Sequence, residues 1–508
     1  MKKIFYISIT TVFSILMVSC KKDFLEKLPN EDLSTEQISE AAKQDPSLLN
    51  GSIAGLYATM YTEYTGGTSG DDDFGQKSYD LFSDILSADV AVGGVTYGWY
   101  SGIAQLQPTR DFTRNEAYMP WRYYYRIIFG ANNVIDALGG TDAVPTATAQ
   151  KHIMGQAKAM RAYAYFYLTQ LYAREGYGTG NEKILPLYKT VSNNVPLSTS
   201  AEIYSLIIDD LTKAVDYLSD FNRRSKDQID QSVAKGLLAY ALSARGTNAD
   251  LQQVVTLTND IIEDYDYRLT NQDETVARFD ANGNVINSQS GFNNVATPSW
   301  MWGVDITIAS NVDITSWWGA FDVFTYGYPS VGDTKVIDEN LYNTMRPDDI
   351  RRGQFDDLPQ FGLTGLIPIN KFFDPGRQLD GQLNVTTDYI YMRVDEFYLL
   401  NAEANAKLNQ DAPARARLKQ LLNLRLTNGT AYVDALSGQA LRNEIYLQTR
   451  LELWGEGKSY LAMKRNKATV TRGPNHLFLD GQSFAYNSVD LTFPIPQAEV
   501  INNPLLNQ

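Results

Sequence analysis

A helical repeat of apolar residues, which recurs along both ends of the chain, constrains the fold more than any other feature. In 156–174 the apolar positions follow one another at spacings of three and four, the stripe of a helix packed on one face. These positions are Met160, Tyr163, Ala164, Tyr167, Leu168 and Leu171. The same stripe occurs in 202–218 and 232–244, and we expect further helices over 391–408, 415–426 and 441–464. The pattern predicts a mainly α protein of stacked helical hairpins.

The middle of the chain breaks this pattern. From about 270 to 390 the helical period disappears, and Gly, Asn, Asp, Pro and aromatic residues dominate. The simplest architecture is a body over 31–508 in which a helical scaffold, about 31–269 and 391–470, holds the irregular, aromatic-rich region of about 270–390. Residues 471–508 form a C-terminal tail.

The N-terminal residues have the pattern of an export signal. Two lysines precede an apolar run over 4–18, which is too short for a membrane span of ~20 residues. Because the small residue Ser19 directly precedes Cys20, we expect a signal peptide over 1–19, lipidation of Cys20 and a tether over 20–30. Cys20 is the only cysteine of the chain. An incidental buried cysteine is the alternative, but a position at the foot of an apolar run favours the lipid anchor.

The charge of the chain limits its partners. It has 44 basic and 59 acidic residues, a formal net charge of −15. An acidic surface disfavours nucleic acid and anionic lipid, and it leaves neutral ligands such as sugars unpenalised. The 32 Tyr, 21 Phe and 7 Trp suit both a hydrophobic core and the flat faces of carbohydrates.

Groups suited to catalysis are sparse. His152 and His476 are the only histidines, and no Gly-x-Ser-x-Gly nucleophile motif occurs. A glycosidase needs only two carboxylates, so the sequence leaves that class open. Glu452 and Glu456 lie four residues apart on an expected helix, where buried pairing with Arg450 or Arg465 is favoured over catalysis.

Three consecutive aspartates, Asp71, Asp72 and Asp73, are the only candidates for a cation site. Carboxylate oxygens suit Ca²⁺, but the spaced ligands of a calcium-binding loop are missing. We therefore interpret the segment as a solvated loop, and the sequence implies no cofactor.

Aromatic residues outside the helical stripes are the best candidates for ligand contacts. Core packing is the alternative for each of them. We assign Trp121 and Trp454, which lie in helical segments, to the core, and we expect Trp99 and one of the adjacent pair Trp317–Trp318 to line a shallow surface site. The full candidate set is Tyr97, Trp99, Tyr100, Trp300, Trp302, Trp317 and Trp318.

Several short blocks occur in an order typical of one family. They are Asp23-Phe24-Leu25-Glu26 after Cys20, Ala131-Asn132-Asn133, Ala157-Lys158-Ala159-Met160-Arg161, Leu185-Pro186-Leu187, Tyr391-Met392-Arg393, Glu396-Phe397-Tyr398-Leu399, Glu452-Leu453-Trp454-Gly455-Glu456-Gly457 and Asn502-Asn503-Pro504-Leu505. Together they run through the chain from residue 20 onward. The chain therefore resembles the SusD/RagB family of outer-membrane nutrient-binding lipoproteins.

The resemblance implies a mainly α fold with tetratricopeptide-like helix pairs. It also implies a lipid-anchored protein on the cell surface of the outer membrane, over a SusC-like TonB-dependent transporter, that captures glycans for import. In the family, ligand contacts come from loops in broadly the two regions that hold 97–100 and 300–318. Two alternatives stay open: a peptide or protein nutrient bound by the same architecture, and a surface glycosidase.

The lipid anchor is directly testable. Cells that express the protein should incorporate radioactive palmitate into it, and Cys20→Ala should lose the label because no other thiol is available. A Cys20→Ala form that still labels would exclude Cys20 as the lipid carrier.

Overall fold

The computed structural model describes residues 35–42, 45–175 and 177–506. The expected signal peptide, Cys20 and the tether over 20–30 lie outside the described residues. No helix in the described part of the chain combines the length and apolarity needed to cross a bilayer.

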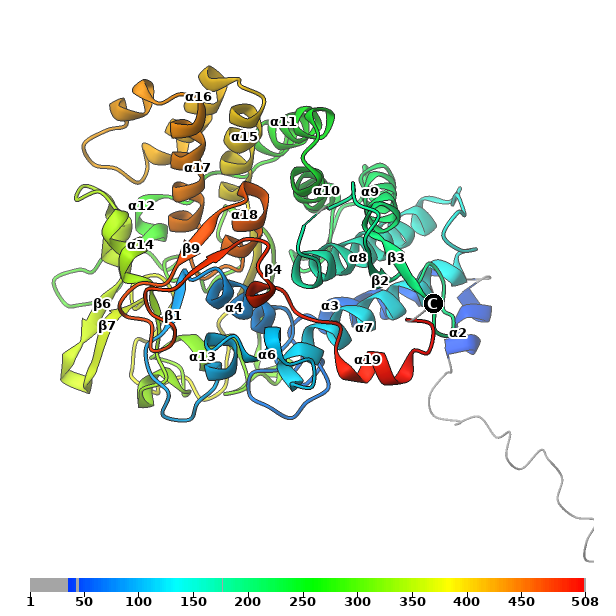
Figure 1. Cartoon of the computed structure of the whole chain (residues 1–508), viewed down its shortest axis with the longest axis horizontal. Coiled ribbons are helices and arrows are strands. Elements are labelled where there is room, and N and C mark those ends of the chain that lie inside the picture. Colours follow the sequence, from blue (N-terminus) through cyan, green and yellow to red (C-terminus); the bar gives the residue numbers. More distant parts are fainter. Residues whose placement is uncertain (1–34, 43–44, 176, 507–508) are drawn as a thin grey trace, which may run out of the picture.

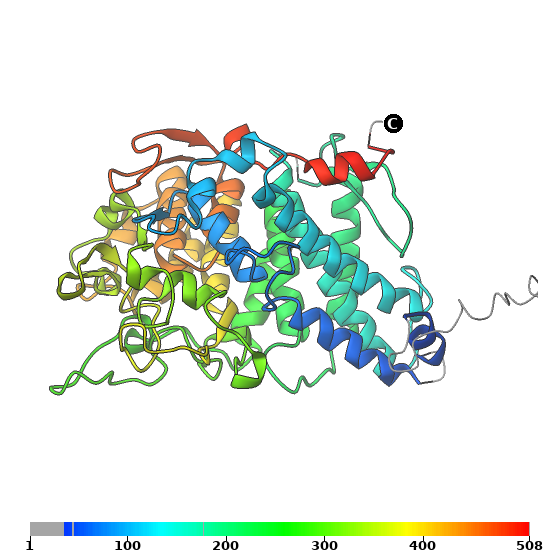
Figure 2. The same cartoon turned by 90° about the horizontal axis from the view of Figure 1, so that it is seen from below.

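Long helices stack in chain order and form one side of the molecule (Figures 1 and 2). The first five are α7 (Asn115–Ala137), α8 (Thr148–Tyr172), α9 (Ser200–Tyr217), α10 (Gln231–Arg245) and α11 (Asn248–Glu263). Each contacts the next, and α11 then contacts α15 (Asp395–Lys407). The C-terminal helices α16 (Asp411–Leu422), α17 (Gly438–Glu452) and α18 (Ser459–Asn466) continue the stack. The mainly α prediction is confirmed.

Shorter helices complete the body. Helices α2 (Thr35–Ala42) and α3 (Leu49–Ala58) lie against α7, and α4 (Gln76–Leu86) is buried along its whole length. The remaining ones are α5 (Ser101–Ala104), α6 (Gln107–Arg110), α12 (Gln272–Thr275), α13 (Trp317–Phe321), α14 (Glu339–Thr344) and α19 (Gln497–Asn502).

The strands form small antiparallel pairs and no extended sheet within the described residues. The pairs are β1 (Val90–Val92) with β5 (Lys335–Ile337), β2 (Lys183–Pro186) with β3 (Leu197–Thr199), β4 (Trp300–Val304) with β8 (Tyr389–Arg393), β6 (Asp356–Leu358) with β7 (Leu363–Ile367), and β9 (Thr469–Thr471) with β10 (Ser483–Ala485). Two of them, β1–β5 and β4–β8, join segments far apart in the sequence, so they fix the irregular middle to the helical part.

Two expected helices differ from the structure. The segment expected as a helix from Tyr391 begins as strand β8, because Ile390, Met392 and Arg393 pair with β4 and the whole strand is buried. The helix expected over 441–464 breaks into α17 and α18. Gly455 and Gly457 have positive φ there, and a Cβ at Gly457 would lie 2.4 Å from the Asp80 side chain.

A buried ion cluster holds the helical side together. Asp210 of α9 accepts hydrogen bonds from Lys158 (2.7 Å) and Arg161 (2.7 and 2.9 Å) of α8, and all three side chains are fully buried. Arg161 also donates to Asn132 of α7 at 2.8 Å. The cluster, through Arg161, therefore links three successive helices.

Removing that carboxylate should destabilise the protein strongly. Asp210→Ala leaves two buried cations unpaired, and we expect a loss of about 3–5 kcal/mol in the free energy of unfolding. The neighbouring Asp209→Ala removes only an exposed pair with Lys213 and should cost about 0.5 kcal/mol or less. Urea denaturation measures both, and equal losses would contradict this role of the cluster.

Candidate functional site

The loop that carries Tyr97 and Trp99 is held by a second loop from the irregular middle. Strands β1 and β5 bring the two loops together. The backbone N–H of Tyr97 donates to both carboxylate oxygens of Asp333 at 3.0 Å. A Cβ at Gly94 would lie 1.6 Å from the carbonyl oxygen of Gly332, so only glycine permits this approach.

Three aromatic side chains meet where these loops touch. The ring of Tyr328 lies edge-on to Tyr97, with centroids 5.5 Å apart, and edge-on to Trp99, at 6.0 Å. Tyr97 is 65% exposed, Trp99 is half-buried, and Tyr328 is 8% exposed. Tyr328 thus supports two rings whose surfaces remain open to solvent.

A hydrogen-bonded network around Asp71 fixes the Tyr328 side chain. Its hydroxyl donates to Asp71, and the hydroxyl of Thr315 donates to the other oxygen of Asp71 at 3.1 Å. Burial, followed by the hydrogen bond to Asp71, raises the pKa of Tyr328. Tyr64, 41% exposed, lies 3.5 Å from the Thr315 hydroxyl. The arrangement places Tyr64, Tyr97 and Trp99 around one rigid polar centre.

A cavity of about 620 Å³, which we call the Trp99 groove, opens beside these rings. Trp99 lines it together with the first turn of α7 and the loop that precedes this helix. The lining residues are Thr68, Ser69, Gly70, Asp72, Trp99, Thr113, Arg114, Asn115, Glu116 and Met119. An aromatic face beside amides, hydroxyls and carboxylates suits a flat ligand rich in hydroxyl groups.

Two carboxyl groups that lie close to Asp71 have raised pKa values. Burial, followed by the charge of Glu116, raises the pKa of Asp72 to about 7. Burial, followed by the charge of Asp313, raises the pKa of Glu63 to about 7. Each carboxyl is therefore partly protonated at neutral pH and offers both a donor and an acceptor.

The interpretation of Asp71–Asp73 as a solvated loop is wrong. Asp73 is fully buried, because it accepts hydrogen bonds from the backbone of Gly66 (2.8 Å) and Thr68 (3.0 Å) and so closes the loop. Asp72 is 8% exposed. Within the described ranges, no group of three or more His, Cys, Asp or Glu residues is arranged to hold a metal ion.

Five of the seven candidate aromatics are buried, so the expectation that they line a surface site is wrong. Trp302 packs between Tyr163 of α8 and Tyr391 of β8, at 5.4 Å from each. Trp317 stacks on Phe321 inside α13, at 4.7 Å. Trp317 also meets Phe372, which lies further along the chain, at 4.8 Å. The five residues, between 0% and 3% exposed, are Tyr100, Trp300, Trp302, Trp317 and Trp318.

Other predicted residues have structural roles. Trp121 and Trp454 are buried, as expected. Glu452 and Glu456 form buried ion pairs, but their partners are Arg393, Arg425, Arg351 and Lys371, not Arg450 or Arg465. His152 pairs with Asp220 at 2.7 Å on the surface.

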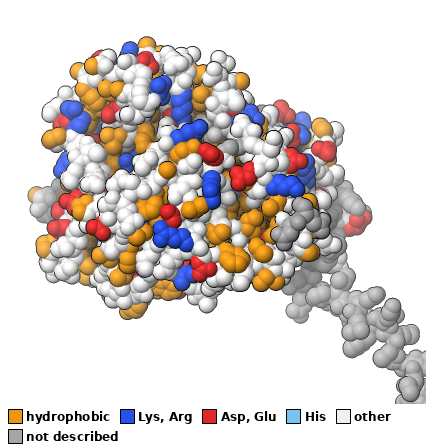
Figure 3. Space-filling view, viewed as in Figure 1, with side chains coloured by type: hydrophobic (Ala, Val, Ile, Leu, Met, Phe, Trp, Pro, Cys, Tyr) orange, Lys and Arg blue, Asp and Glu red, His pale blue; other side chains and the backbone are white. Residues whose placement is uncertain are grey.

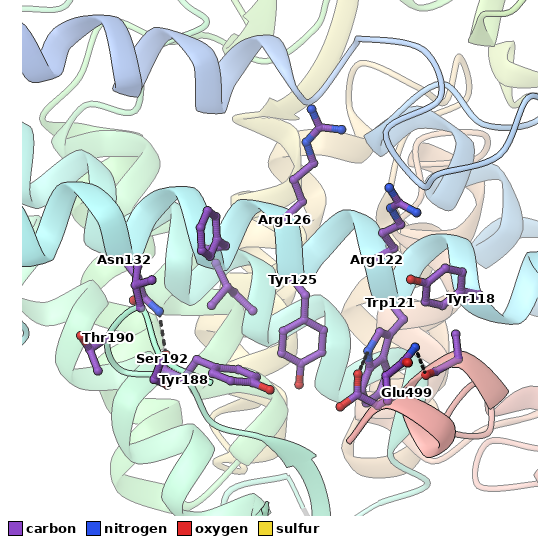
Figure 4. Close-up of a pocket in the computed structure, with 15 residues that line it drawn as sticks. Tyr118, Trp121, Arg122, Tyr125, Arg126, Asn132, Tyr188, Thr190, Ser192 and Glu499 are labelled. Atoms are coloured by element: carbon purple, nitrogen blue, oxygen red, sulfur yellow. Dashed lines mark hydrogen bonds between the residues drawn. The ribbon is translucent and has the colours of Figure 1, made fainter. Parts of the chain in front are cut away.

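A second cavity, of about 650 Å³, lies along α7, and we call it the α7 groove (Figure 4). Tyr118, Trp121, Tyr125 and Phe129 line it at helical spacing, together with Arg122 and Arg126. Tyr188, which follows β2, and Glu499 of α19 lie opposite. In Figure 4 the two arginines extend from one edge of α7, and Trp121, Tyr125 and Tyr188 lie toward the other.

Comparison with known proteins identifies the family of this chain. Residues 23–245 match a family model described as starch-binding and associating with the outer membrane. Residues 342–508 match the model of the SusD family. The chain belongs to the SusD/RagB family.

Curated SusD-like proteins match over part of their length. The chain is 29% identical to one from Bacteroides ovatus over 174 residues, which are 32% of this chain and 30% of that protein. It is 26% identical to one from Formosa agariphila over 163 residues, 32% of this chain and 29% of that protein. The matched segments thus span less than a third of these SusD relatives.

Solved SusD-like structures share the whole fold. A SusD-like carbohydrate binding protein from Bacteroides vulgatus has a TM-score of 0.74 at 22% identity, covering 90% of this chain and 96% of its own. Surface glycan-binding protein A from Bacteroides uniformis has a TM-score of 0.67 at 17% identity, covering 91% and 98%.

The sequence of this SusD-family chain did not predict that Tyr328 packs against Tyr97 and Trp99, or that the first turn of α7 lines the Trp99 groove. It also missed the α7 groove, although the spacing of Tyr118, Tyr125 and Phe129 around two arginines was a readable signal.

The raised pKa of Asp72 makes stability depend on pH. The folded protein holds this proton up to about pH 7, whereas the unfolded chain releases it near 3.8, so stability falls as pH rises through this window. Asp72→Asn should raise the melting temperature at pH 8 and leave it unchanged at pH 4. The exposed Asp142→Asn serves as control and should change neither value. An equal rise in the melting temperature of Asp72→Asn at both pH values would contradict the raised pKa of Asp72.

Proposed function

We propose that this protein is a cell-surface glycan-binding lipoprotein that captures oligosaccharides or polysaccharides in the Trp99 groove. The observation that carries the proposal is the pair of solvent-open rings, Tyr97 and Trp99, held by Tyr328 beside a cavity lined with hydroxyl, amide and carboxyl groups. A pyranose ring has C–H bonds on its flat faces that an aromatic ring covers, and its hydroxyls need such polar partners.

The setting of the groove supports this ligand class. The family model is described as starch-binding, and similar folds include proteins described as carbohydrate-binding and glycan-binding. Two carboxyl groups, Asp72 and Glu116, line the groove, and negative charge on them disfavours anionic ligands relative to uncharged, hydroxyl-rich ones.

The proposal includes binding without catalysis. Glu452 and Glu456, the carboxylates that resemble a catalytic pair in sequence, are buried in ion pairs with arginines and Lys371. A buried, paired carboxylate has no access to a glycosidic bond.

We further propose an outer-membrane location through a lipid on Cys20 and delivery of the captured glycan to a SusC-like TonB-dependent transporter.

Substitution of the open rings tests the site. Trp99→Ala and Tyr97→Ala should each weaken glycan binding about tenfold or more, equivalent to about 1.4 kcal/mol, because each removes a stacking face. Retardation in native gels that contain single polysaccharides measures this. Phe361→Ala, which removes a ring 46% exposed on the loop between β6 and β7, is the matched control and should bind normally.

The outcomes separate the alternatives. Retardation without soluble products supports capture, whereas release of soluble sugars would indicate a glycosidase. No retardation by any glycan would favour a peptide or protein nutrient. A large fall in the melting temperature of Trp99→Ala would assign that ring to the core and contradict the proposed site.

A further inference from the structure

Two arginines on the exposed face of α7 have no partner among the described residues. Arg122 and Arg126 are exposed and lie one helical turn apart. Neither side chain makes a hydrogen bond or an ion pair with another described residue. Like charges four residues apart destabilise a helix, and a chain with a net charge of −15 has many carboxylates that could neutralise them. The two guanidinium groups are therefore available to bind an anionic ligand.

The carboxylates around the α7 groove are occupied elsewhere. Glu499 accepts hydrogen bonds from the indole of Trp121 at 3.4 Å and from Asn503 at 2.9 Å. Asp136 accepts from the hydroxyl of Thr190 at 2.6 Å and from the backbone of Val191 at 2.8 Å. The groove thus has spare cationic donors, which an anionic group fits in bidentate geometry.

The rings of the α7 groove are fixed and partly open. The hydroxyl of Tyr125 donates to the carbonyl of Pro186 at 2.9 Å, and its ring meets Tyr188 edge-on at 5.8 Å. Phe129 is 56% exposed, and Tyr125 and Tyr188 are half-buried. A cavity of about 650 Å³ is within the size range of small-ligand sites. The groove therefore combines rigid flat faces with cationic donors (Figure 4).

We propose that the α7 groove is a second binding site, which takes saccharides that bear carboxylate or sulfate groups. A sugar ring lies against Tyr125, Tyr188 or Phe129, and its anionic group binds Arg122 and Arg126. This ligand class differs from the uncharged one that the acidic Trp99 groove favours, so the site goes beyond the function proposed above and does not require it.

The two grooves lie along the same helix. The first turn of α7 lines the Trp99 groove, and later turns line the α7 groove. Arg122 also packs against the loop of the first site, since a Cβ at Gly67 would lie 2.5 Å from its side chain.

The test compares two double variants that change the net charge equally. Arg122→Gln/Arg126→Gln removes the proposed site, and Arg174→Gln/Arg224→Gln removes two other exposed arginines that lack a side-chain partner among the described residues. Calorimetric titration of the full-length protein uses oligogalacturonate, a chondroitin sulfate oligosaccharide, a malto-oligosaccharide and inorganic sulfate. At least one acidic oligosaccharide should bind, and the first variant should lose affinity tenfold or more. The second variant should bind normally, and added NaCl should weaken binding.

Two further measurements separate this site from the Trp99 groove. Phe129→Ala should lower the affinity for the acidic oligosaccharide at least threefold, and Trp99→Ala should leave this affinity unchanged. Binding lost in Trp99→Ala but kept in the arginine variant would overturn the second site while supporting the first. The inference also fails if no acidic oligosaccharide binds, or if inorganic sulfate binds as tightly as the oligosaccharides. If the unsubstituted protein bound an acidic oligosaccharide but no neutral glycan, that result would contradict only the proposed function.

Discussion

A buried network of charges at the end of α17 is the interaction on which the rest of the structure depends. Glu452 binds Arg393 (2.9 Å), Arg425 (2.8 Å) and Arg351 (3.2 Å), and Glu456 binds Arg393 (2.8 Å) and Lys371 (2.9 Å). Burial alone would raise the pKa of Glu452, but the surrounding arginines hold it well below its usual range. Removing one partner from such a cluster costs about 3–5 kcal/mol, because the remaining charges stay buried and unpaired.

This network connects the helical stack to the irregular middle and, through it, to the proposed site. Arg351 and Lys371 come from the middle, and Arg393 ends β8, which pairs with β4. Beside the network, Asp89 binds Arg450 (2.5 and 2.9 Å) and accepts a hydrogen bond at its carbonyl from Trp454 (2.7 Å). Asp89 directly precedes β1, whose pairing with β5 positions the loop of Tyr97 and Trp99. The loop of Tyr97 and Trp99 is thus anchored to the buried network. On the face shown in Figure 3, acidic and basic side chains are scattered among hydrophobic ones.

Local sequence predicted the long helices well and the burial of individual aromatics poorly. The stripes at 202–218 and 232–244 match α9 and α10 to within two residues, because one face of each helix packs and its period is visible locally. Exposure in the middle region depends on contacts from far along the chain. Trp302 is covered by Tyr163 and Tyr391, and neither neighbour is visible in the sequence around it. Tyr97 stays open because the loop that meets it, 328–334, supports only one side.

The first turn of α7 links the electrostatics of the two grooves. Glu116 lies at the N-terminal end of the helix, where a negative charge stabilises the helix dipole, and it also pairs with Arg114 at 2.9 Å. Burial, followed by this charge, raises the pKa of Asp72 to about 7, and Asp72 lines the Trp99 groove. Two turns later the charge on α7 reverses at Arg122 and Arg126. Since a hydroxyl both donates and accepts, it pairs with Asp72 in either protonation state, whereas an anionic group is repelled there and attracted along the helix. A single helix thereby sets opposite ligand preferences at its first turn and around Arg122 and Arg126.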